Sequence, residues 1–305
     1  MHKALLEWYE KHGRHDLPWR NTHDLYHVYL SEIMLQQTQV NRVMEEYYPQ
    51  FLEKFPSLST LAAASQDDVL AAWSGLGYYS RARNLHKTAQ LSPETLPTEE
   101  KELLKLPGIG RYTASAICSF GLSQAVPVVD TNIARVIKRH TALINPKDSI
   151  VWERATAMLN QDSPRDHNLA LMDLGSMVCL PKNPKCSLCP LEESCQGKED
   201  PEQYTQTKKV HYESLELYYG VCIKSGKVAL HYSKEKMYKD MLVLPRVEPI
   251  EDQFMGKFKH SYTKYRIEVN LYSAEEFLED IVWVEIEKLE DAPISSLIKK
   301  AQTYF

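Results

Sequence analysis

Four of the chain's six cysteines fall within seventeen residues, in the stretch "CLPKNPKCSLCPLEESC". They are Cys179, Cys186, Cys189 and Cys195, separated by six, two and five residues. Thiols gathered in this way in a reducing compartment are typical ligands of a soft metal centre, either tetrahedral zinc or an iron–sulfur cluster. Zinc sites usually place two CxxC pairs on either side of a longer loop, whereas this loop holds one CxxC pair and four close ligands. The spacing therefore favours a cluster over a single ion.

Two acidic residues lie where a carboxylate could do acid–base chemistry. Glu32 sits within the apolar stretch "YLSEIML", where burial would raise its pKa and keep a proton available. On a helix, Glu32, Gln36 and Gln39 would share one face, and periodicity alone favours a solvated polar stripe for them. Asp130 follows an apolar run in "PVVDTNIARV", where capping of the next helix is the more ordinary role. The residues alone leave these alternatives open.

A glycine-containing turn, "LPGIGRYTASAICSF", follows the helical stretch "EEKELLKL". Pro107 and Gly108 are predicted to end that helix, and Gly110 to allow a second backbone reversal before a new helix begins. Backbone N–H groups at such a helix start bind phosphate without reading sequence. A plain helical turn would also use glycine, but residues 101–150 carry seven Lys/Arg against three Asp/Glu, a net charge of +4. The local charge favours binding to the DNA backbone.

The composition of the whole chain is that of an ordinary globular protein, and its 305 residues are enough for two domains. The overall charge of −5 argues mildly against a nucleic-acid binder, but the acid is concentrated in residues 251–305, with eleven Asp/Glu against seven Lys/Arg. No apolar run reaches the roughly 18 residues of a membrane span, and "MHKALLEWYEKHG" lacks the features of a secretory signal. We therefore expect a cytoplasmic protein, nucleoid-associated in a bacterium, with no membrane partner.

The pattern along the chain predicts a mainly α protein with a small α/β domain at its C-terminal end. Apolar residues recur at helical spacing up to residue 197, and strand-like alternation is hard to find there. Residues 198–212 are polar and read as a linker. From residue 213 to 305 come β-type runs such as "LELYYGVCI" and "YRIEVNLYS", followed by a final helix in "PISSLIKKAQTYF". Cys118 and Cys222 stand alone in apolar runs and are predicted to be small core residues.

The turn, Asp130 and the cysteine spacing, in this order, resemble the endonuclease III superfamily of helix–hairpin–helix DNA glycosylases. The resemblance implies a [4Fe–4S] cluster on the four clustered cysteines. It also implies a six-helix module over about residues 20–124 and an iron–sulfur module from residues 1–19 and 125–197. Bifunctional members carry a lysine nucleophile directly after the final Gly-Arg of the hairpin, where this chain has Tyr112. We therefore expect a monofunctional glycosylase, which leaves an abasic site.

Three further stretches, "LPWR", "YLSEIMLQQTQVNRV" and "WSGLGYYSRARNLHKTA", resemble the MutY-type adenine glycosylases. These base excision repair enzymes remove adenine mispaired with 8-oxoguanine or guanine. Two carboxylates in distinct environments suit that chemistry, because the leaving base needs a proton and the sugar cation needs an anion. By resemblance, Glu32 protonates adenine N7, and Asp130 stabilises the oxocarbenium ion or traps it covalently. Tyr112 and Asn132 would support that carboxylate, and Arg20 would line the adenine pocket.

The resemblance also assigns residues to the DNA. Adenine must leave the duplex to be cleaved, and a side-chain wedge helps to unstack it. Tyr78 in "GLGYY" would be that wedge, with Tyr79 exposed beside it, and Gln37 and Leu76 would hold the opposite strand. Phosphates would be bound by Gly108, Gly110, Lys182 and Lys185. The expected partner is double-stranded DNA with an A:8-oxoguanine or A:G mismatch, bound by a monomer.

The likeness is weaker after residue 197. In the family a Nudix-like domain reads 8-oxoguanine, partly through a Phe-Ser-His element. Here "FKHSYTKYRIEV" takes that place, with Thr263 able to supply the serine hydroxyl and Lys264 where the histidine would be. The domain is short and lacks the Nudix hydrolase signature, so we expect no pyrophosphatase activity and weaker discrimination of 8-oxoguanine from guanine.

Two other functions remain open at this stage. A thymine or uracil mismatch glycosylase of the same superfamily also carries tyrosine at the hairpin position. A non-catalytic DNA-damage binder or redox sensor would use the cluster without the carboxylates.

Overall fold

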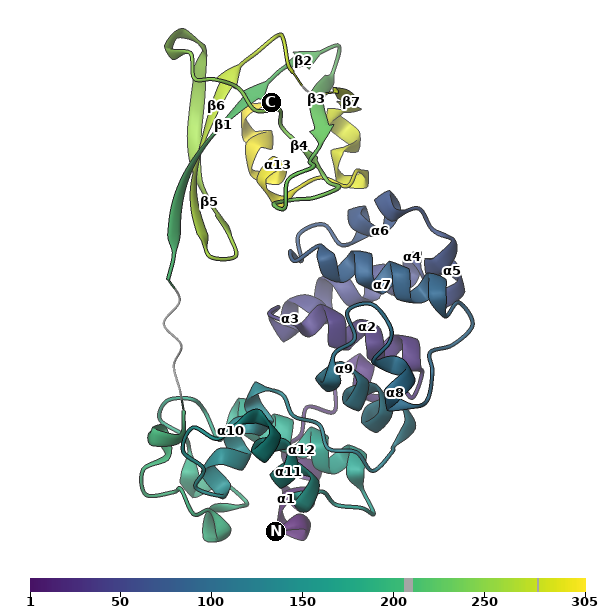
Figure 1. Cartoon of the computed structure of the whole chain (residues 1–305), viewed down its shortest axis with the longest axis vertical. Helices are drawn as coiled ribbons and strands as arrows, with labels where there is room; N and C mark the ends of the chain where they lie inside the picture. Colours follow the sequence, from purple (N-terminus) through teal and green to yellow (C-terminus); the bar gives the residue numbers. More distant parts are fainter. Residues whose placement is uncertain (206–210, 279) are drawn as a thin grey trace. The chain divides into compact units, whose positions relative to one another are not determined.

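In the computed structural model, the structure describes residues 1–205, 211–278 and 280–305 (Figure 1). Its contacts divide the chain into two compact units. The first comprises Met1–Tyr48 and Leu91–Lys208, and the second comprises Pro49–Gln90 and Lys209–Phe305. The second unit thus includes part of the helical region as well as the C-terminal sheets. The domain limits expected from the sequence remain a prediction, and residues 206–210 of the expected linker lie outside the described residues.

The helical character expected for the first two thirds of the chain is confirmed. No strand occurs in residues 1–205, all of which the structure describes. The helices of the first unit, some of which continue into short 3₁₀ or π segments, are α1 His2–His12, α2 Leu25–Leu35, α3 Val40–Arg42, α8 Glu100–Leu103, α9 Arg111–Ala116, α10 Thr131–His140, α11 Asp148–Met158 and α12 Pro164–Met177. In the second unit or at its border lie α4 Tyr48–Lys54, α5 Leu58–Ala63, α6 Gln66–Ala72 and α7 Ser80–Leu91.

Helix α2 is shorter than its sequence predicts. Asp24 caps its N-terminus by accepting hydrogen bonds from the backbone N–H groups of Tyr26 and His27. The helix ends at Leu35 because Gln37 adopts a φ of 59°, which a right-handed helix cannot accommodate. The expectation that Glu32, Gln36 and Gln39 share one helix face is therefore wrong, and Glu32 alone of the three belongs to the helix.

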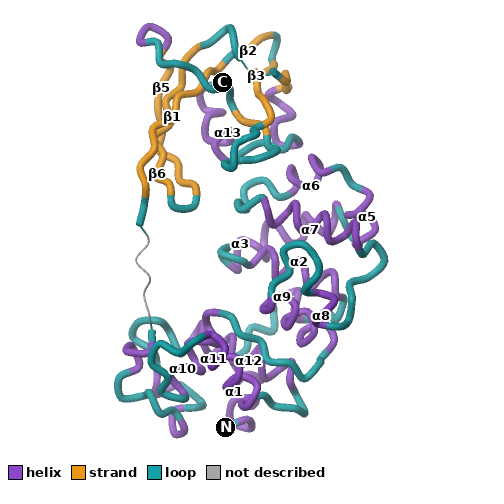
Figure 2. Tube along the Cα trace, in the orientation of Figure 1, coloured by secondary structure: helices purple, strands orange, loops and turns teal. Residues whose placement is uncertain are grey.

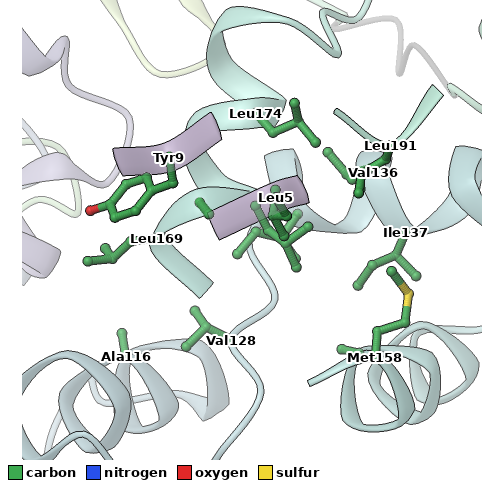
Figure 3. Close-up of a cluster of buried hydrophobic side chains, with 14 of the residues drawn as sticks. Leu5, Tyr9, Ala116, Val128, Val136, Ile137, Met158, Leu169, Leu174 and Leu191 are labelled. Atoms are coloured by element: carbon green, nitrogen blue, oxygen red, sulfur yellow. The ribbon is translucent and has the colours of Figure 1, made fainter. Parts of the chain in front are cut away.

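The core of the first unit joins α1 to α10 and α12 (Figure 3). Leu5 of α1, Ile137 of α10 and Leu174 of α12 are all fully buried in one apolar cluster. Helices α10 and α12 approach closely at Gly175, where a Cβ atom would lie 2.7 Å from the Cβ of Asn132 and 2.9 Å from its carbonyl oxygen. The absence of a side chain at position 175 therefore lets α12 pack against the first turn of α10.

The hairpin connects α8 to α9. Gly108 has a φ of 74°, a left-handed conformation that glycine adopts without strain. Gly110 is extended, with φ −91° and ψ 177°, so the expectation that it provides a second glycine-dependent reversal is wrong. Helix α9 continues directly into a π-helical segment, Ile117–Gly121.

The second unit contains two small sheets and a final helix (Figure 2). In the first sheet, β6 lies between β1, with which it is parallel, and β5, with which it is antiparallel. In the second, β3 pairs antiparallel with β2, β4 and β7. The strands are β1 Glu213–Val221, β2 Ile223–Lys224, β3 Lys227–Tyr232, β4 Leu242–Val243, β5 Phe254–Tyr262, β6 Tyr265–Ser273 and β7 Val282–Glu285, and the helix is α13 Ser296–Ala301.

The fold class is confirmed as mainly helical with a small C-terminal α/β part. The sequence does not predict strand β5, because most of its side chains are exposed or half-buried and it lacks a clear apolar alternation. Among the described residues, no helix is long and apolar enough to cross a membrane.

Replacing Gly175 by alanine is expected to destabilise the protein. The added methyl group collides with Asn132, and overpacking of this kind costs about 1–3 kcal/mol. Urea unfolding of Gly175→Ala and of Gly110→Ala provides a matched comparison. A Cβ at Gly110 meets no atom within 4 Å, so this control should change the free energy of unfolding by less than about 1 kcal/mol. Equal effects of the two variants would contradict the close approach of α10 and α12.

Candidate active site and cysteine loop

A cavity of about 1010 Å³ in the first unit brings together all five residues predicted to carry the catalysis or to line the adenine pocket. They come from the segment before α2, from α2 itself, and from the N-terminal turns of α9 and α10. These residues are Arg20, Glu32, Tyr112, Asp130 and Asn132. Every residue that lines the cavity belongs to the first unit.

Glu32 is a buried carboxyl group with only 6% of its surface exposed. Burial raises its pKa to about 7, and the negative charge of Asp130 acts in the same direction. The Tyr112 hydroxyl donates a hydrogen bond to Glu32 Oε2 at 2.5 Å, which opposes this shift, as does the charge of Arg20. Glu32 therefore exchanges a proton near neutral pH, as its apolar sequence surroundings predict.

Tyr112 has a different hydrogen-bond partner from the one expected. We expected its hydroxyl to support Asp130, but it binds Glu32 instead. The first turn of α9 places the tyrosine against α2, 80 residues earlier in the chain. Burial and the neighbouring carboxylates raise the pKa of Tyr112 well above its usual value, so the phenol keeps its proton and remains a donor.

Asp130 is both a helix cap and a part of the cavity wall. One carboxylate oxygen accepts from the backbone N–H of Ile133 at 2.7 Å, which caps α10. The other accepts from Asn132 Nδ2 at 3.0 Å. Burial raises the pKa of Asp130, although the hydrogen bonds from Ile133 and Asn132 act in the opposite direction. Capping and acid–base chemistry are thus compatible roles here.

Arg20 is held by a buried partner that sequence reasoning missed. Its Nη1 and Nη2 atoms lie 2.6 and 2.7 Å from the two oxygens of Asp173, a side chain with no exposed surface. Arg14 donates to the same carboxylate from its backbone N and its Nε atom. Burial alone would raise the pKa of Asp173, but the hydrogen bonds and charges of the two arginines lower it. An aspartate inside the apolar helix sequence "NLALMDLG" was the available signal, because a buried charge requires a partner.

The four clustered cysteines line a second, smaller cavity of about 30 Å³ in the first unit. All six cysteines of the chain lie in its described part and are free thiols. Arg139 donates from Nη1 to the Sγ atom of Cys179 at 3.3 Å. Burial raises the pKa of Cys189 to about 11, and it also raises the pKa values of Cys186 and Cys195. Within the described residues, no three His, Cys, Asp or Glu side chains converge closely enough to hold one metal ion.

Residues 30–160 match a protein family described as "HhH-GPD superfamily base excision DNA repair protein". In sequence, these residues therefore resemble that superfamily. Two relatives are each called "Adenine DNA glycosylase". The one from Buchnera aphidicola subsp. Baizongia pistaciae is 41% identical over 203 residues, which cover 64% of this chain and 58% of the relative. The human one is 42% identical over 218 residues, which cover 66% of this chain and 40% of the relative. The match thus spans little more than half the length of these relatives, or less.

Solved structures agree with the HhH-GPD fold. A thermostable thymine-DNA glycosylase superposes with a TM-score of 0.60 at 28% identity, covering 65% of this chain and 94% of that chain. An endonuclease III–DNA complex superposes with a TM-score of 0.56 over the same shares. At 20% identity, this likeness supports the fold and nothing further.

The remaining predicted DNA contacts are distributed over both units. Gln37 lines the large cavity of the first unit. Gly108, Gly110 and Lys185 are exposed there, and Lys182 is as well. Thr263 is exposed in the second unit, at the turn between β5 and β6, with a φ of 51°.

The loop predicted to carry the wedge differs in part from expectation. Tyr78 is 40% exposed and has a left-handed backbone with a φ of 49°. Tyr79 and Leu76 are only 3% and 6% exposed. The prediction of two exposed aromatic side chains is therefore wrong for Tyr79, whose ring packs against Tyr238 of the second unit.

The stability of the protein should depend on pH through Glu32. The folded-state pKa of about 7 exceeds the ordinary value of 4.5, so the folded protein binds more protons than the unfolded chain between these pH values. Stability is therefore lost as pH rises through this window, and Glu32→Gln removes the loss. Between pH 5 and 8.5 the variant should gain about 2 kcal/mol of unfolding free energy relative to the wild type.

Urea unfolding at both pH values measures this difference. Glu45→Gln, at an exposed position, is the matched control and should follow the wild type at both pH values. An equal change in the free energy of unfolding between the two pH values for Glu32→Gln and the wild type would show that the Glu32 carboxyl group is not desolvated.

Proposed function

We propose that this protein is a monofunctional DNA glycosylase of base excision repair, which hydrolyses the N-glycosidic bond of adenine mispaired with 8-oxoguanine or guanine. The observation that carries the proposal is the pairing of Glu32 and Asp130 in one cavity, with burial raising the pKa of Glu32 to about 7. The relatives named adenine DNA glycosylase support adenine as the base. Tyr112, where bifunctional relatives have a lysine, supports hydrolysis without an amine nucleophile.

The reaction divides between the two carboxyl groups. Glu32 gives its proton to N7 of an adenine flipped out of the duplex, so that the electron pair of the C1′–N9 bond leaves with the base. The anionic Asp130 stabilises the positive charge that develops on the sugar. Water then adds to C1′ and loses a proton, which leaves an abasic site. The hydrogen bond from Tyr112 to Oε2 fixes the carboxyl group of Glu32, and Asn132 with the N–H of Ile133 fixes Asp130.

The proposed partner is mismatched double-stranded DNA, bound by the protein as a monomer. The exposed backbone at Gly108 and Gly110 suits phosphate, and a Cβ at Gly110 would meet open space, so a ligand can approach there. Lys185 adds a positive charge beside the cysteine loop. In the second unit, Tyr78 would enter the duplex beside the opposite base, and Thr263 would contact that base. Leu76 is buried, so its role would be to support the wedge loop from within.

We also propose that Cys179, Cys186, Cys189 and Cys195 hold a [4Fe–4S] cluster. The four thiols surround one cavity, and the hydrogen bond from Arg139 to Cys179 is of a kind that tunes cluster ligands. The ligand spacing, with one CxxC pair inside a compact loop, favours the cluster over a single zinc ion. Glycosidic hydrolysis needs no electron transfer, so the cluster would organise the loop.

A duplex with adenine opposite 8-oxoguanine tests the proposed activity. After incubation with the protein, treatment with alkali should break the strand at the adenine. Glu32→Gln and Asp130→Asn should each lower the single-turnover rate at least about 100-fold, because each removes a group that acts in the transition state. The measurement is strand cleavage on denaturing gels over time.

The same assay separates the alternatives. The likeness to a thymine-DNA glycosylase makes duplexes with T:G and U:G mismatches the necessary comparison. Cleavage of these in place of A:8-oxoguanine would assign the chain to that substrate. A folded, iron-loaded protein that binds the mismatch and cleaves no duplex would be a damage binder.

The metal proposal predicts a brown protein with broad visible absorption and about four irons per chain. Cys186→Ser should lower the iron content and the stability of the loop, because one ligand is lost. Cys222→Ser, a buried cysteine of the second unit, is the matched control and should keep the iron. Stoichiometric zinc in a colourless protein purified without oxygen would refute the cluster.

A further inference from the structure

Three aromatic rings connect the β5–β6 turn to the wedge loop within the second unit. Tyr262, the last residue of β5, packs edge-on against Tyr238 with ring centroids 4.8 Å apart. Tyr238 in turn lies 6.5 Å from Tyr79. Thr263 directly follows Tyr262 in the chain, and Tyr78 directly precedes Tyr79. The two residues proposed to meet the opposite base are thus joined through one buried ring, that of Tyr238.

Tyr238 is held in place from several sides. Its hydroxyl oxygen is hydrogen-bonded to Nε2 of His260 at 2.5 Å and lies 3.5 Å from Ser296 Oγ. His260 is 6% exposed, and burial together with the charge of Lys300 lowers its pKa to about 4, so the imidazole is neutral near pH 7. A neutral ring at this position avoids an uncompensated buried charge. The bridging ring therefore has little freedom to rotate independently of β5.

The backbone carries strain at the same three places. Tyr78, Tyr238 and Thr263 have φ values of 49°, 57° and 51°. This left-handed conformation is unfavourable for residues with a side chain, and such strain persists only where the surroundings enforce it. Each of these three residues is therefore held in its conformation by the packing around it.

Further contacts hold the wedge loop to the C-terminal part of the unit. Ser74 donates to the carbonyl oxygen of Ile294 at 3.3 Å, and Lys299 donates to the carbonyl oxygen of Ser74 at 3.4 Å. Arg83, one turn into α7, donates to the carbonyl oxygen of Lys239, the residue after Tyr238. The loop and the Tyr238 segment are therefore constrained to move together.

We propose that Tyr238 is a positioning residue that couples the β5–β6 turn at Thr263 to the wedge Tyr78. Contact of the turn with the base opposite adenine then changes how Tyr78 is presented to the duplex. The inference rests on the proposed function, because it requires both side chains to meet the same mismatch. It makes Tyr238, a side chain only 2% exposed, a determinant of how the opposite base affects binding.

A double-mutant cycle measures this coupling. The probe is a duplex with 2′-deoxy-2′-fluoroadenosine, which resists glycosidic hydrolysis, opposite 8-oxoguanine. Dissociation constants are measured for the wild type, Thr263→Ala, Tyr78→Leu and the double variant. In the wild-type background, the loss of affinity of the double variant should be at least about threefold smaller than the product of the two single losses. In the Tyr238→Leu background, the loss of the double variant should equal that product within about 1.5-fold.

Two further backgrounds separate the relay from general destabilisation. Tyr238→Phe keeps the rings and should retain the coupling. Tyr272→Leu removes an equally large ring from the same sheet, where it packs against Tyr218 and Phe254, and it should also retain the coupling. If Tyr238→Leu does not fold, as judged by thermal unfolding, Tyr79→Leu breaks the same relay from the other side.

Additive effects in the wild-type background, or coupling that survives Tyr238→Leu or Tyr79→Leu, would overturn the relay. Failure of the proposed function gives a different result. In that case the wild type would bind the probe no more tightly than a matched A:T duplex, and it would cleave no adenine opposite 8-oxoguanine.

Discussion

Glu32 keeps its proton near neutral pH only if the positive charge of a nearby arginine is compensated. Arg20 lines the same cavity, and its positive charge lowers the pKa of Glu32. The fully buried carboxylate of Asp173 accepts two hydrogen bonds from Arg20, and its negative charge compensates the positive charge of the guanidinium. Without Asp173, the charge of Arg20 would be uncompensated and would lower the pKa of Glu32 further. The buried ion pair would therefore act on the proposed proton transfer by compensating the charge of Arg20. Its net effect on stability can be small.

Helix α10 transmits this geometry to the cysteine loop. Asp130 caps its first turn, and Arg135 and Arg139 project from its later turns. Arg135 donates to the Oδ1 atom of Asn132, to the carbonyl oxygen of Gly175 and to that of Cys179. One guanidinium therefore connects Asn132, which binds Asp130, to α12 and to the cysteine loop. Arg139 reaches the Sγ atom of Cys179. A filled cysteine site would thus stiffen the anion-bearing end of α10 by mechanical means alone.

The sequence was most informative where a property depends on neighbours along the chain. Apolar periodicity predicted the helices, the spacing of the thiols predicted their gathering, and the apolar setting of Glu32 predicted its raised pKa. Partners far apart in the chain were missed. Asp173 lies 153 residues from Arg20, and the Tyr112–Glu32 bond spans 80 residues. Local pattern also failed where backbone conformation decided the outcome, as at Gln37, whose φ of 59° ends α2 early, and in the largely exposed strand β5.

The division into two units separates two tasks that a mismatch glycosylase must perform. All residues proposed to break the glycosidic bond lie in the first unit, whereas Tyr78 and Thr263 lie in the second. Residues 49–90 of the second unit follow one segment of the first unit and precede another, so the wedge segment is joined to the first unit at both of its ends. Because that segment packs with the C-terminal sheets, the proposed contact with the opposite base lies in the same unit as the proposed wedge. The proposed coupling between the β5–β6 turn and the wedge then runs through side-chain packing within one unit. It requires no residue of the second unit in the wall of the large cavity.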